Sequence, residues 1–324
     1  MKEEQEFKLD VAHIAHVELL TPTLQDSLCF FRDILGLRVV AQEGKSIFLR
    51  AYWDQQIYSL KLTESPYAGL GHLSFRAQSR RALERIVHDI EDSGLGMGWI
   101  DGDYGHGPAY RFRTPNGHLC EVFDEAKRYC APKENLPYLK NQPDVFLGQG
   151  LNVQQFDHCN LFSSDVDSDT RFLRDVLGFR LSEVAIDRDG KQTTAWLHVT
   201  NKSYDLAISR DQTGLRGRFH HLAYRVDSLE AVMRAADLFM ERGVYIEVPP
   251  NKHVAGQTIF VYVYEPGGNR IEVCSGGFLI YTPDWETVTW SAEERRRGLA
   301  WGTQLPASFH RYGTPVHEQY QTTD

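Results

Sequence analysis

The sequence is poor in cysteine and has no long apolar run. Its five cysteines form no Cys-x-x-Cys pair, and such a sparse, odd set is typical of reduced thiols in the cytoplasm. No stretch approaches the roughly 18 apolar residues that a membrane helix requires. The N-terminal segment MKEEQEFKLD also lacks the apolar centre of a signal peptide. We therefore expect a cytoplasmic protein without a membrane partner.

Positive charge is also scarce. The chain has 35 Lys and Arg residues against 44 Asp and Glu residues, which gives a net charge of −9. Binding to a phosphate backbone requires a basic face, so we expect no nucleic-acid partner. At 324 residues the chain is long enough for two domains of ordinary size.

The most informative positive feature is an internal repeat. Four segments of the first half return in the same order in the second half, which indicates a duplicated module. For example, GHLSFR returns as HHLAYR, and TPNGHLCEVF returns as EPGGNRIEVC. The paired segments are 15–20 with 157–162, 30–39 with 171–181, 71–76 with 220–225, and 114–123 with 265–274.

Apolar periodicity and turn residues predict the elements of each module. In the second module we expect strands at 155–163, 194–199, 203–208, 217–226, 259–264 and 270–274, and helices at 165–177 and 229–242. The helix at 229–242 is expected to bury Val232, Met233, Ala236 and Met240. The first module is expected to echo this order, with its second helix at 80–93.

These patterns divide the chain into an N-terminal domain at 1–140, a C-terminal domain at 150–282 and an extension at 283–324. The segment 131–150 is rich in proline and polar residues and is interpreted as the linker. The last residues, 314–324, are polar and are expected to be frayed.

Three residues of the second module form a candidate metal site. His158, His221 and Glu272 recur at positions that match the first module, and two imidazoles with one carboxylate are the ligand set of non-haem Fe(II) oxygenases. A single strand histidine is more often a core or surface residue. Adjacent strand residues face opposite ways, so only one of His220 and His221 can be a ligand. We prefer His221 because it aligns with His72.

The stretch 251–272 strengthens this assignment. It contains a histidine, a seven-residue spacer, an aliphatic residue, a tyrosine, an acidic residue, Pro-x-Gly and a later glutamate. These are His253, Val261, Tyr262, Glu265, Pro266, Gly268 and Glu272. In this pattern the chain resembles the extradiol ring-cleavage dioxygenases of the vicinal oxygen chelate superfamily, the catechol 2,3-dioxygenase type. The resemblance covers both modules.

The resemblance implies an α+β fold, in which each domain pairs two βαβββ motifs and curls a mixed sheet around a cavity. It implies that Fe(II), or Mn(II) in some members, binds His158, His221 and Glu272 and that the enzyme cleaves a catechol-like aromatic diol with O₂. A homo-oligomer, dimer or tetramer, is also a family expectation. Rival hypotheses on the same fold are a glyoxalase-type metal lyase and a protein that sequesters small molecules.

Further roles follow from the resemblance. Tyr262 would hydrogen-bond the deprotonated substrate oxygen, and His253 would act from the edge of the pocket. Trp196 would form a wall beside the O₂ position. Asn160 shares the strand face of His158 and is a candidate pocket residue. Each of these could instead be an ordinary core or loop residue.

The chain departs from the family at Tyr204. The family usually has a His-Asp-x-Ala run, whose histidine moves protons, whereas the run here is Tyr-Asp-Leu-Ala at 204–207. A tyrosine with a reference pKa near 10 is a poor base at neutral pH. Tyr204 could serve as a proton donor, His198 could supply the imidazole, or the substrate could carry its own acid or base.

Two other features leave alternatives open. Arg297, in the run of arginines at 295–297, is a candidate contact for a substrate carboxylate, or this run forms a solvated helix face. In the first module His16, His72 and Glu121 match the three ligands, but Arg111 replaces Tyr262 and Gly102 replaces His253. We expect this module to be a structural relic, with a second metal site as the alternative.

Overall fold

The computed structural model describes residues 8–146 and 148–316. Each half of the chain repeats a strand–helix–three-strand motif twice, as predicted. The first half comprises β1 (Val11–Thr21), α1 (Leu24–Cys29), β2 (Arg38–Glu43), β3 (Ser46–Arg50), β4 (Leu60–Glu64), β5 (Gly69–Ala77), α2 (Arg80–Asp92), β6 (Gly96–Ile100), β7 (Ala109–Arg113) and β8 (Leu119–Phe123). A π-helix (Phe30–Ile34) continues α1.

The second half has the same order of elements. It comprises β9 (Gln155–Ser163), α3 (Val166–Asp175), β10 (Arg180–Ile186), β11 (Gln192–His198), β12 (Leu206–Arg210), β13 (Phe219–Arg225), α4 (Leu229–Glu241), β14 (Ile246–Lys252), β15 (Thr258–Tyr264) and β16 (Arg270–Gly276). The duplication extends to helix capping, because Ser79 and Ser228 each accept a hydrogen bond from the third residue of the following helix.

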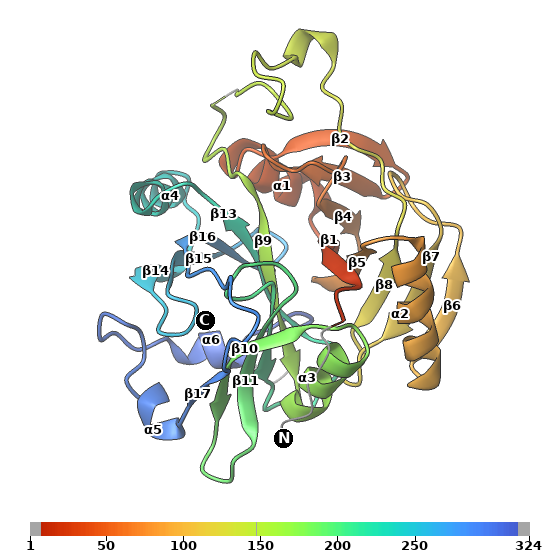
Figure 1. The fold of residues 1–324 in the computed structure, drawn as a ribbon. Coiled ribbons are helices and arrows are strands. Elements are labelled where there is room, and N and C mark those ends of the chain that lie inside the picture. The colour runs from red at the N-terminus through yellow and green to blue at the C-terminus, as the bar shows by residue number, and fades with distance from the viewer. Residues whose placement is uncertain (1–7, 147, 317–324) are drawn as a thin grey trace.

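Two curled mixed sheets form the framework (Figure 1). Their strand orders are β2-β3-β4-β1-β5-β8-β7-β6 and β14-β15-β16-β13-β9-β12-β11-β10-β17, where β17 is Val288–Trp290. In the first sheet β1 is parallel to β4 and antiparallel to β5, and β9 relates to β12 and β13 in the same way in the second. The α+β class with paired βαβββ motifs is therefore confirmed.

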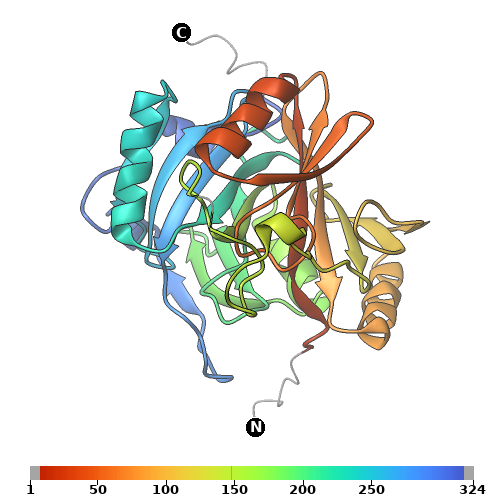
Figure 2. The same cartoon turned by 90° about the horizontal axis from the view of Figure 1, so that it is seen from above.

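The two halves share one hydrophobic core. Phe30 of the first half stacks on Phe239 of α4 at 6.3 Å between ring centroids, and Phe31 contacts Tyr224 edge-on. Helices α2 and α4 lie on opposite outer sides of the molecule (Figure 2). The modules are thus fixed against each other by packing as well as by the linker.

One predicted helix face is wrong. In α4 the buried residues are Ala231, Val232, Ala235 and Phe239. Met233 and Met240 are instead 52% and 69% exposed. The helix is rotated relative to the prediction because Phe239 packs across the module boundary, a contact that the helix's own pattern does not reveal.

The linker and the extension are mostly irregular. The linker contains one short 3-10 helix (Lys133–Asn135) and projects from the first module (Figure 1). The extension contains β17 (Val288–Trp290), α5 (Ala292–Arg295) and α6 (Ala307–Arg311). Because β17 pairs with β10, the extension completes the second sheet.

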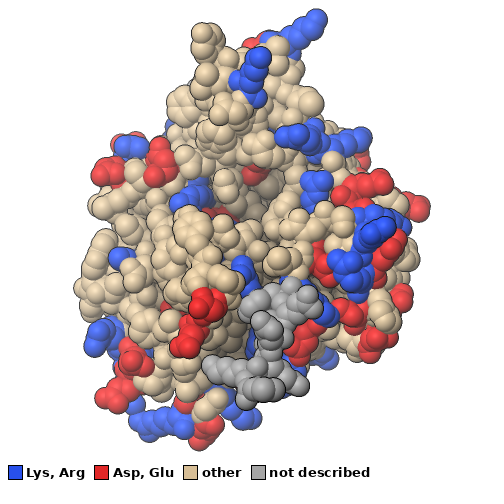
Figure 3. All heavy atoms as spheres, viewed as in Figure 1, with Lys and Arg blue, Asp and Glu red and all other residues tan. Residues whose placement is uncertain are grey.

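The expected fraying after residue 314 is wrong at its start. Thr314 is 1% exposed and exchanges backbone hydrogen bonds with Phe219. Residues 317–324 lie outside the described residues. Among the described residues no helix is long and apolar enough to cross a membrane. Acidic and basic side chains are interspersed over the face shown in Figure 3.

Candidate active site

Strand register brings the predicted ligands together. His158 on β9 pairs with Ala223 on β13, which pairs with Glu272 on β16, which pairs with Tyr262 on β15. The four residues form one row across the sheet. His221 precedes Ala223 by two residues and therefore shares its face. The alternation of the strands explains why these side chains point to one side of the sheet.

The three candidate ligand groups converge in the interior. The Nε2 atoms of His158 and His221 lie 3.2 Å apart, and each lies 3.1 Å from Oε2 of Glu272. All three side chains are at most 3% exposed. Burial alone would raise the pKa of Glu272, but the two imidazoles outweigh it and hold this pKa well below its ordinary value.

The hydrogen-bond network assigns the tautomers of both histidines. Nδ1 of His158 lies 2.8 Å from Oδ1 of Asp157 and donates to it. His220 donates through Nε2 to the carbonyl of Phe309 at 2.9 Å, so its Nδ1 accepts from Nδ1 of His221 at 2.7 Å. In the neutral imidazoles of His158 and His221, each Nε2 therefore directs a lone pair to the shared centre.

This donor set fits a divalent metal ion. Two imidazole lone pairs and an ionised carboxylate face one point, and Oε1 of Glu272 has no hydrogen-bond partner among the described residues. Converging acceptors repel one another unless a cation lies between them. Two histidines and one carboxylate suit Fe(II) and leave coordination positions open.

A cavity of about 300 Å³ adjoins this centre. We call it the ligand cavity. Among its lining residues are His158, His221, His253, Tyr262, Trp196, Asn160 and Tyr204. The fold thus brings most of the predicted site residues to one space, and Oδ1 of Asn160 is buried in it without a partner among the described residues.

Tyr262 and His253 form a relay to the carboxylate. The Tyr262 hydroxyl donates to Oε2 of Glu272 at 2.8 Å and lies 2.9 Å from Nε2 of His253. The His253 ring stacks on Phe260 at 3.9 Å, and burial lowers the pKa of His253 to about 3. A neutral His253 can donate its Nε2 proton to the tyrosine oxygen.

Tyr204 lies on the other side of His158. Their ring centroids are 4.5 Å apart, and the Tyr204 hydroxyl lies 3.4 Å from Oγ1 of Thr258. Burial raises the pKa of Tyr204 well above its ordinary value, so it is a neutral phenol that can donate a proton but is no base at neutral pH. Gly256 makes room for this ring, because a Cβ there would lie 2.5 Å from Cε1 of Tyr204.

Two predicted site residues are not brought to the ligand cavity. His198 donates through Nδ1 to the carbonyl of Thr200 at 2.8 Å, and it lines a separate cavity beside Trp285. His198 shares a face of β11 with Trp196 but is the last residue of that strand, and Trp196 alone of the two lines the ligand cavity. The side chain of Arg297 is exposed.

Arg295, from the same run of arginines, lines the ligand cavity instead. Its guanidinium lies 5.4 Å from the ring centroid of Trp196. Burial lowers the pKa of Arg295, and the nearby Glu183 opposes that effect. The prediction of an arginine at the pocket was therefore off by two residues, because α5 is a four-residue helix whose orientation the local pattern does not define.

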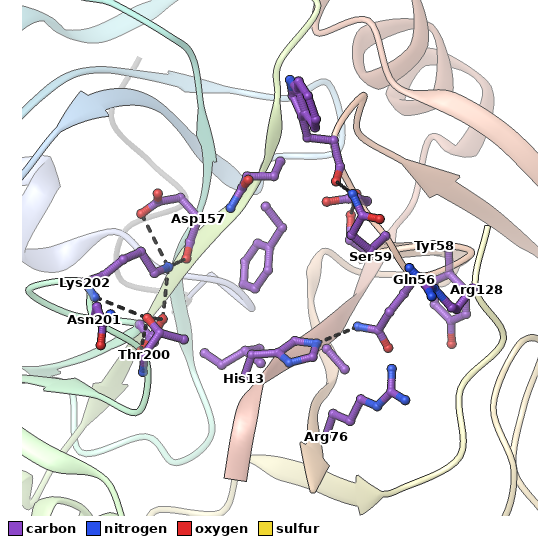
Figure 4. A pocket seen from close by; sticks show the side chains of 18 of the residues that line it. His13, Gln56, Tyr58, Ser59, Arg76, Arg128, Asp157, Thr200, Asn201 and Lys202 are labelled. Carbon is purple, nitrogen blue, oxygen red and sulfur yellow. Dashed lines mark hydrogen bonds and ion pairs between the residues drawn. The ribbon is translucent and has the colours of Figure 1, made fainter. Parts of the chain in front are cut away.

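A larger cavity of about 650 Å³ lies between the modules. Its lining includes His13, Arg76 and Arg128 from the first half and Asp157 and Lys202 from the second (Figure 4). Lys202 pairs with Asp157 there, as Figure 4 shows, and it also pairs with Asp205. The smaller ligand cavity is the better candidate for the reaction, because both candidate histidine ligands, His158 and His221, line it.

Comparison with known proteins agrees with this geometry. The model of the Glyoxalase/Bleomycin resistance protein/Dioxygenase superfamily matches residues 13–122 and 155–273. Metapyrocatechase of Geobacillus stearothermophilus is 46% identical over 318 residues, which is 97% of each chain. The manganese-dependent 2,3-dihydroxybiphenyl 1,2-dioxygenase of Geobacillus genomosp. 3 is 34% identical and covers 90% of this chain and 94% of its own length.

Solved structures give the same result. The substrate complex of homoprotocatechuate 2,3-dioxygenase from Brevibacterium fuscum with 3,4-dihydroxyphenylacetate superposes with a TM-score of 0.84 at 25% identity. The alignment covers 98% of this chain and 96% of that one.

Proposed function

Since this chain belongs to the Glyoxalase/Bleomycin resistance protein/Dioxygenase superfamily and, within it, to the extradiol ring-cleaving dioxygenases, we propose that its second module opens the ring of a catechol-like aromatic diol with O₂. The proposal rests on one observation above all. Two histidine lone pairs and an ionised carboxylate converge beside a cavity that also contains a tyrosine–histidine relay.

His158, His221 and Glu272 would hold the metal ion, and we propose Fe(II), with Mn(II) as the alternative. When bound, such an ion supplies adjacent open positions for the diol and O₂ and conducts electron transfer between them. Asp157 orients His158, and His220 orients His221, through the Nδ1 hydrogen bonds described above. Both oxygen atoms of O₂ enter the product, so the reaction needs no external reductant.

The relay would bind the ionised oxygen of the substrate. Tyr262 holds its proton toward the carboxylate and can turn it toward a substrate oxygen at the same centre. A hydrogen bond to an ionised oxygen is roughly twice as strong as a neutral one. His253 keeps the Tyr262 hydroxyl in place from behind. This division makes Tyr262 the substrate contact and His253 its support.

Tyr204 would donate a proton on the opposite side of His158. Its neutral phenol is enclosed by Gly256 and Thr258, which fix the ring. Trp196 and Asn160 line the same cavity and would bound the position of the diol. A protonated phenol suits release of a ring-opened acid better than initial deprotonation of the diol, which the metal would favour by lowering the pKa of a bound hydroxyl.

We also propose that the enzyme acts in the cytoplasm as a homo-oligomer, a dimer or tetramer. All five cysteines are unpaired, as in a reducing compartment. Exposed apolar residues just before the extension, including Leu279 and Tyr281, offer area for a subunit contact. Light scattering of the purified protein would give the number of chains.

The function is tested by anaerobic loading with Fe(II), followed by O₂ uptake with a panel of catechols. We expect one O₂ per ring and a yellow ring-opened product. The Glu272→Gln variant should lose metal and turnover together. Tight binding of diols without O₂ uptake would support a sequestering protein, and O₂-independent isomerisation of a thiol adduct would support a glyoxalase-type lyase.

A further inference from the structure

The first module contains a second cluster of metal-ligating side chains. His16 on β1 pairs with Ser74 on β5, which pairs with Glu121 on β8. His72 precedes Ser74 by two residues and shares its face. This row repeats the arrangement of the candidate active site, residue for residue.

A fourth side chain completes the cluster. His106 comes from the loop between β6 and β7, where its ring stacks on Phe123 at 4.4 Å between centroids. Spacing from the Pro-x-Gly motif aligns Gly102 with His253, so the repeat pattern does not predict a ligand at His106. This loop corresponds to the β14–β15 loop, which carries His253, but it is longer and places its histidine at a different spacing.

The three imidazoles converge on one oxygen atom of Glu121. The Nε2 atoms of His16, His72 and His106 lie 3.4, 3.3 and 3.4 Å from Oε1 of Glu121. The Nε2 atoms of His16 and His72 are 3.0 Å apart. Each of the four side chains is at most 2% exposed.

Hydrogen bonds around this centre define the tautomers of two of its histidines. His72 donates through Nδ1 to Oε2 of Glu18 at 2.8 Å, and His106 donates through Nδ1 to the carbonyl of Gly107 at 2.9 Å. In the neutral rings both Nε2 atoms therefore carry lone pairs that face the Glu121 carboxylate. Nε2 of His106 has no hydrogen-bond partner among the described residues.

Few donors compensate this arrangement. The Ser74 hydroxyl donates to Oε1 of Glu121 at 3.0 Å, and the Tyr58 hydroxyl lies 3.2 Å from Nε2 of His16. Nε of Arg111 lies 3.5 Å from the other carboxylate oxygen. Buried acceptors that face one another without a proton are costly unless a cation joins them.

We propose that His16, His72, His106 and Glu121 bind a second divalent transition-metal ion, in a closed site that takes no substrate. Three imidazoles and one carboxylate form a complete four-ligand set, and full occupation by protein ligands is typical of structural sites. Imidazole-rich sets favour Zn²⁺ or Fe²⁺ over Mn²⁺. The site would join β1, β5, β8 and the β6–β7 loop.

The closed character follows from two replacements. The first module has Arg111 where the second has Tyr262. The positive charge of Arg111 disfavours an additional cation, but it pairs with Oε2 of Glu121, the carboxylate oxygen that faces away from the histidines. Where the second module has a cavity, the first has His106 as a fourth ligand. The module expected to be a structural relic would thus keep a metal while losing the reaction.

The test is the metal content of the full-length protein after loading with Fe(II) and Zn(II) and removal of loose ions by gel filtration. We expect about two ions per chain, falling to about one in His106→Gln and to about one in Glu272→Gln. His118→Gln is the matched control, because His118 is a buried histidine of the same module that bonds the Arg218 carbonyl at 3.0 Å instead. It should retain both ions.

A second measurement does not depend on variants. Crystals of the wild-type protein, measured above and below the zinc and iron absorption edges, should show an anomalous peak between Glu121 and the three histidines. No peak there, together with about one ion per chain in wild type, would mean that an imidazolium proton rather than a metal balances the cluster, and the proposal would fail. The anomalous map reports on the two modules separately, so the absence of a metal ion in the first module would not contradict the proposed ring cleavage in the second.

Discussion

Replacing Asp157 by asparagine is the sharpest test of how the fold tunes the candidate metal centre. The Asp157 carboxylate receives the Nδ1 proton of His158 at 2.8 Å and is 6% exposed. Burial would raise its pKa, but Lys202 and His158 hold the pKa below its ordinary value, so the group is ionised at neutral pH. The variant keeps the size of the side chain and removes its charge.

The expected magnitude follows from that contact. A hydrogen bond to a charged group contributes about 1.5–3 kcal/mol. The carboxamide can also present its NH₂ group to Nδ1, which would favour the tautomer with a proton on Nε2 and block the ligand atom. Loss of such an outer partner typically weakens metal binding by about 10- to 100-fold, which corresponds to about 1.4–2.8 kcal/mol.

The measurement is competition for Fe(II) or Mn(II) with a chelator of known affinity, under anaerobic conditions. The Asp157→Asn variant should still fold, because Lys202 keeps its salt bridge to Asp205 at 3.0 Å. Asp144→Asn is the control. Asp144 is also a buried aspartate with two cationic partners, Arg38 at 2.7 Å and Arg50 at 3.1 Å, but it contacts no histidine ligand.

We expect the control to lower the free energy of unfolding without changing metal affinity. If Asp157→Asn binds metal as tightly as wild type while remaining folded, the outer carboxylate does not set the tautomer of His158. If both variants weaken metal binding equally, general destabilisation rather than orientation is the cause.

Three further outcomes follow from the geometry. In steady-state assays Arg295→Leu should raise KM for a carboxylated catechol at least roughly tenfold more than KM for catechol, since hydrogen bonds to charged groups contribute about 1.5–3 kcal/mol and Arg295 lines the ligand cavity. Arg297→Leu is the control, because Arg297 is exposed, and it should change neither KM. Equal effects of the two variants would contradict the assignment of Arg295 as the carboxylate contact. Tyr204→Phe should lower kcat by roughly 100-fold with little change in KM, as for loss of a general acid, and an unchanged kcat would exclude the donor role. Glu247→Gln should destabilise the fold by about 3–5 kcal/mol because it leaves Arg270 buried without its partner at 2.5 Å. Burial raises the pKa of Glu247, but Arg270 outweighs this and lowers it. The Glu247 carboxylate therefore makes its full contribution to the free energy of unfolding above the unfolded pKa near 4.5. That contribution is lost as pH falls through the folded pKa. Urea unfolding should therefore give different free energies of unfolding for the variant and wild type at pH 7 and similar ones in strongly acidic buffer.

The parts of the site that lie on paired strands could be predicted from the sequence. His158, His221, Glu272 and Tyr262 lie on strands, and a period of two residues with a repeated order of elements is enough to assign their faces. Their roles as ligands and substrate contact remain predictions for the experiments above. The fold class could be predicted for the same reason, because the duplication doubles every signal.

The parts that depend on loops and on short helices could not be predicted. Arg295 rather than Arg297 enters the cavity because the capping box of Ser291 and Glu294 sets where α5 begins. A helix of four residues is too short for its apolar pattern to show which side faces the cavity. His106 lies in the β6–β7 loop, and the equivalent β14–β15 loop carries His253 at a different spacing, so comparing spacings between the modules does not find His106. The exposed Met233 reflects packing between modules, which no single helix encodes.

The two candidate centres suggest how one duplicated framework can serve two purposes. Both place two strand histidines and a carboxylate in one row, so the sheet alone does not decide whether a site reacts. The difference lies in what fills the remaining directions: a third imidazole, His106, in the first module, and Tyr262 with His253 in the second. A tyrosine that bonds the carboxylate leaves coordination positions free, whereas a histidine whose Nε2 faces the centre occupies one. In the proposed sites, openness to substrate is thus set by one loop side chain and not by the fold.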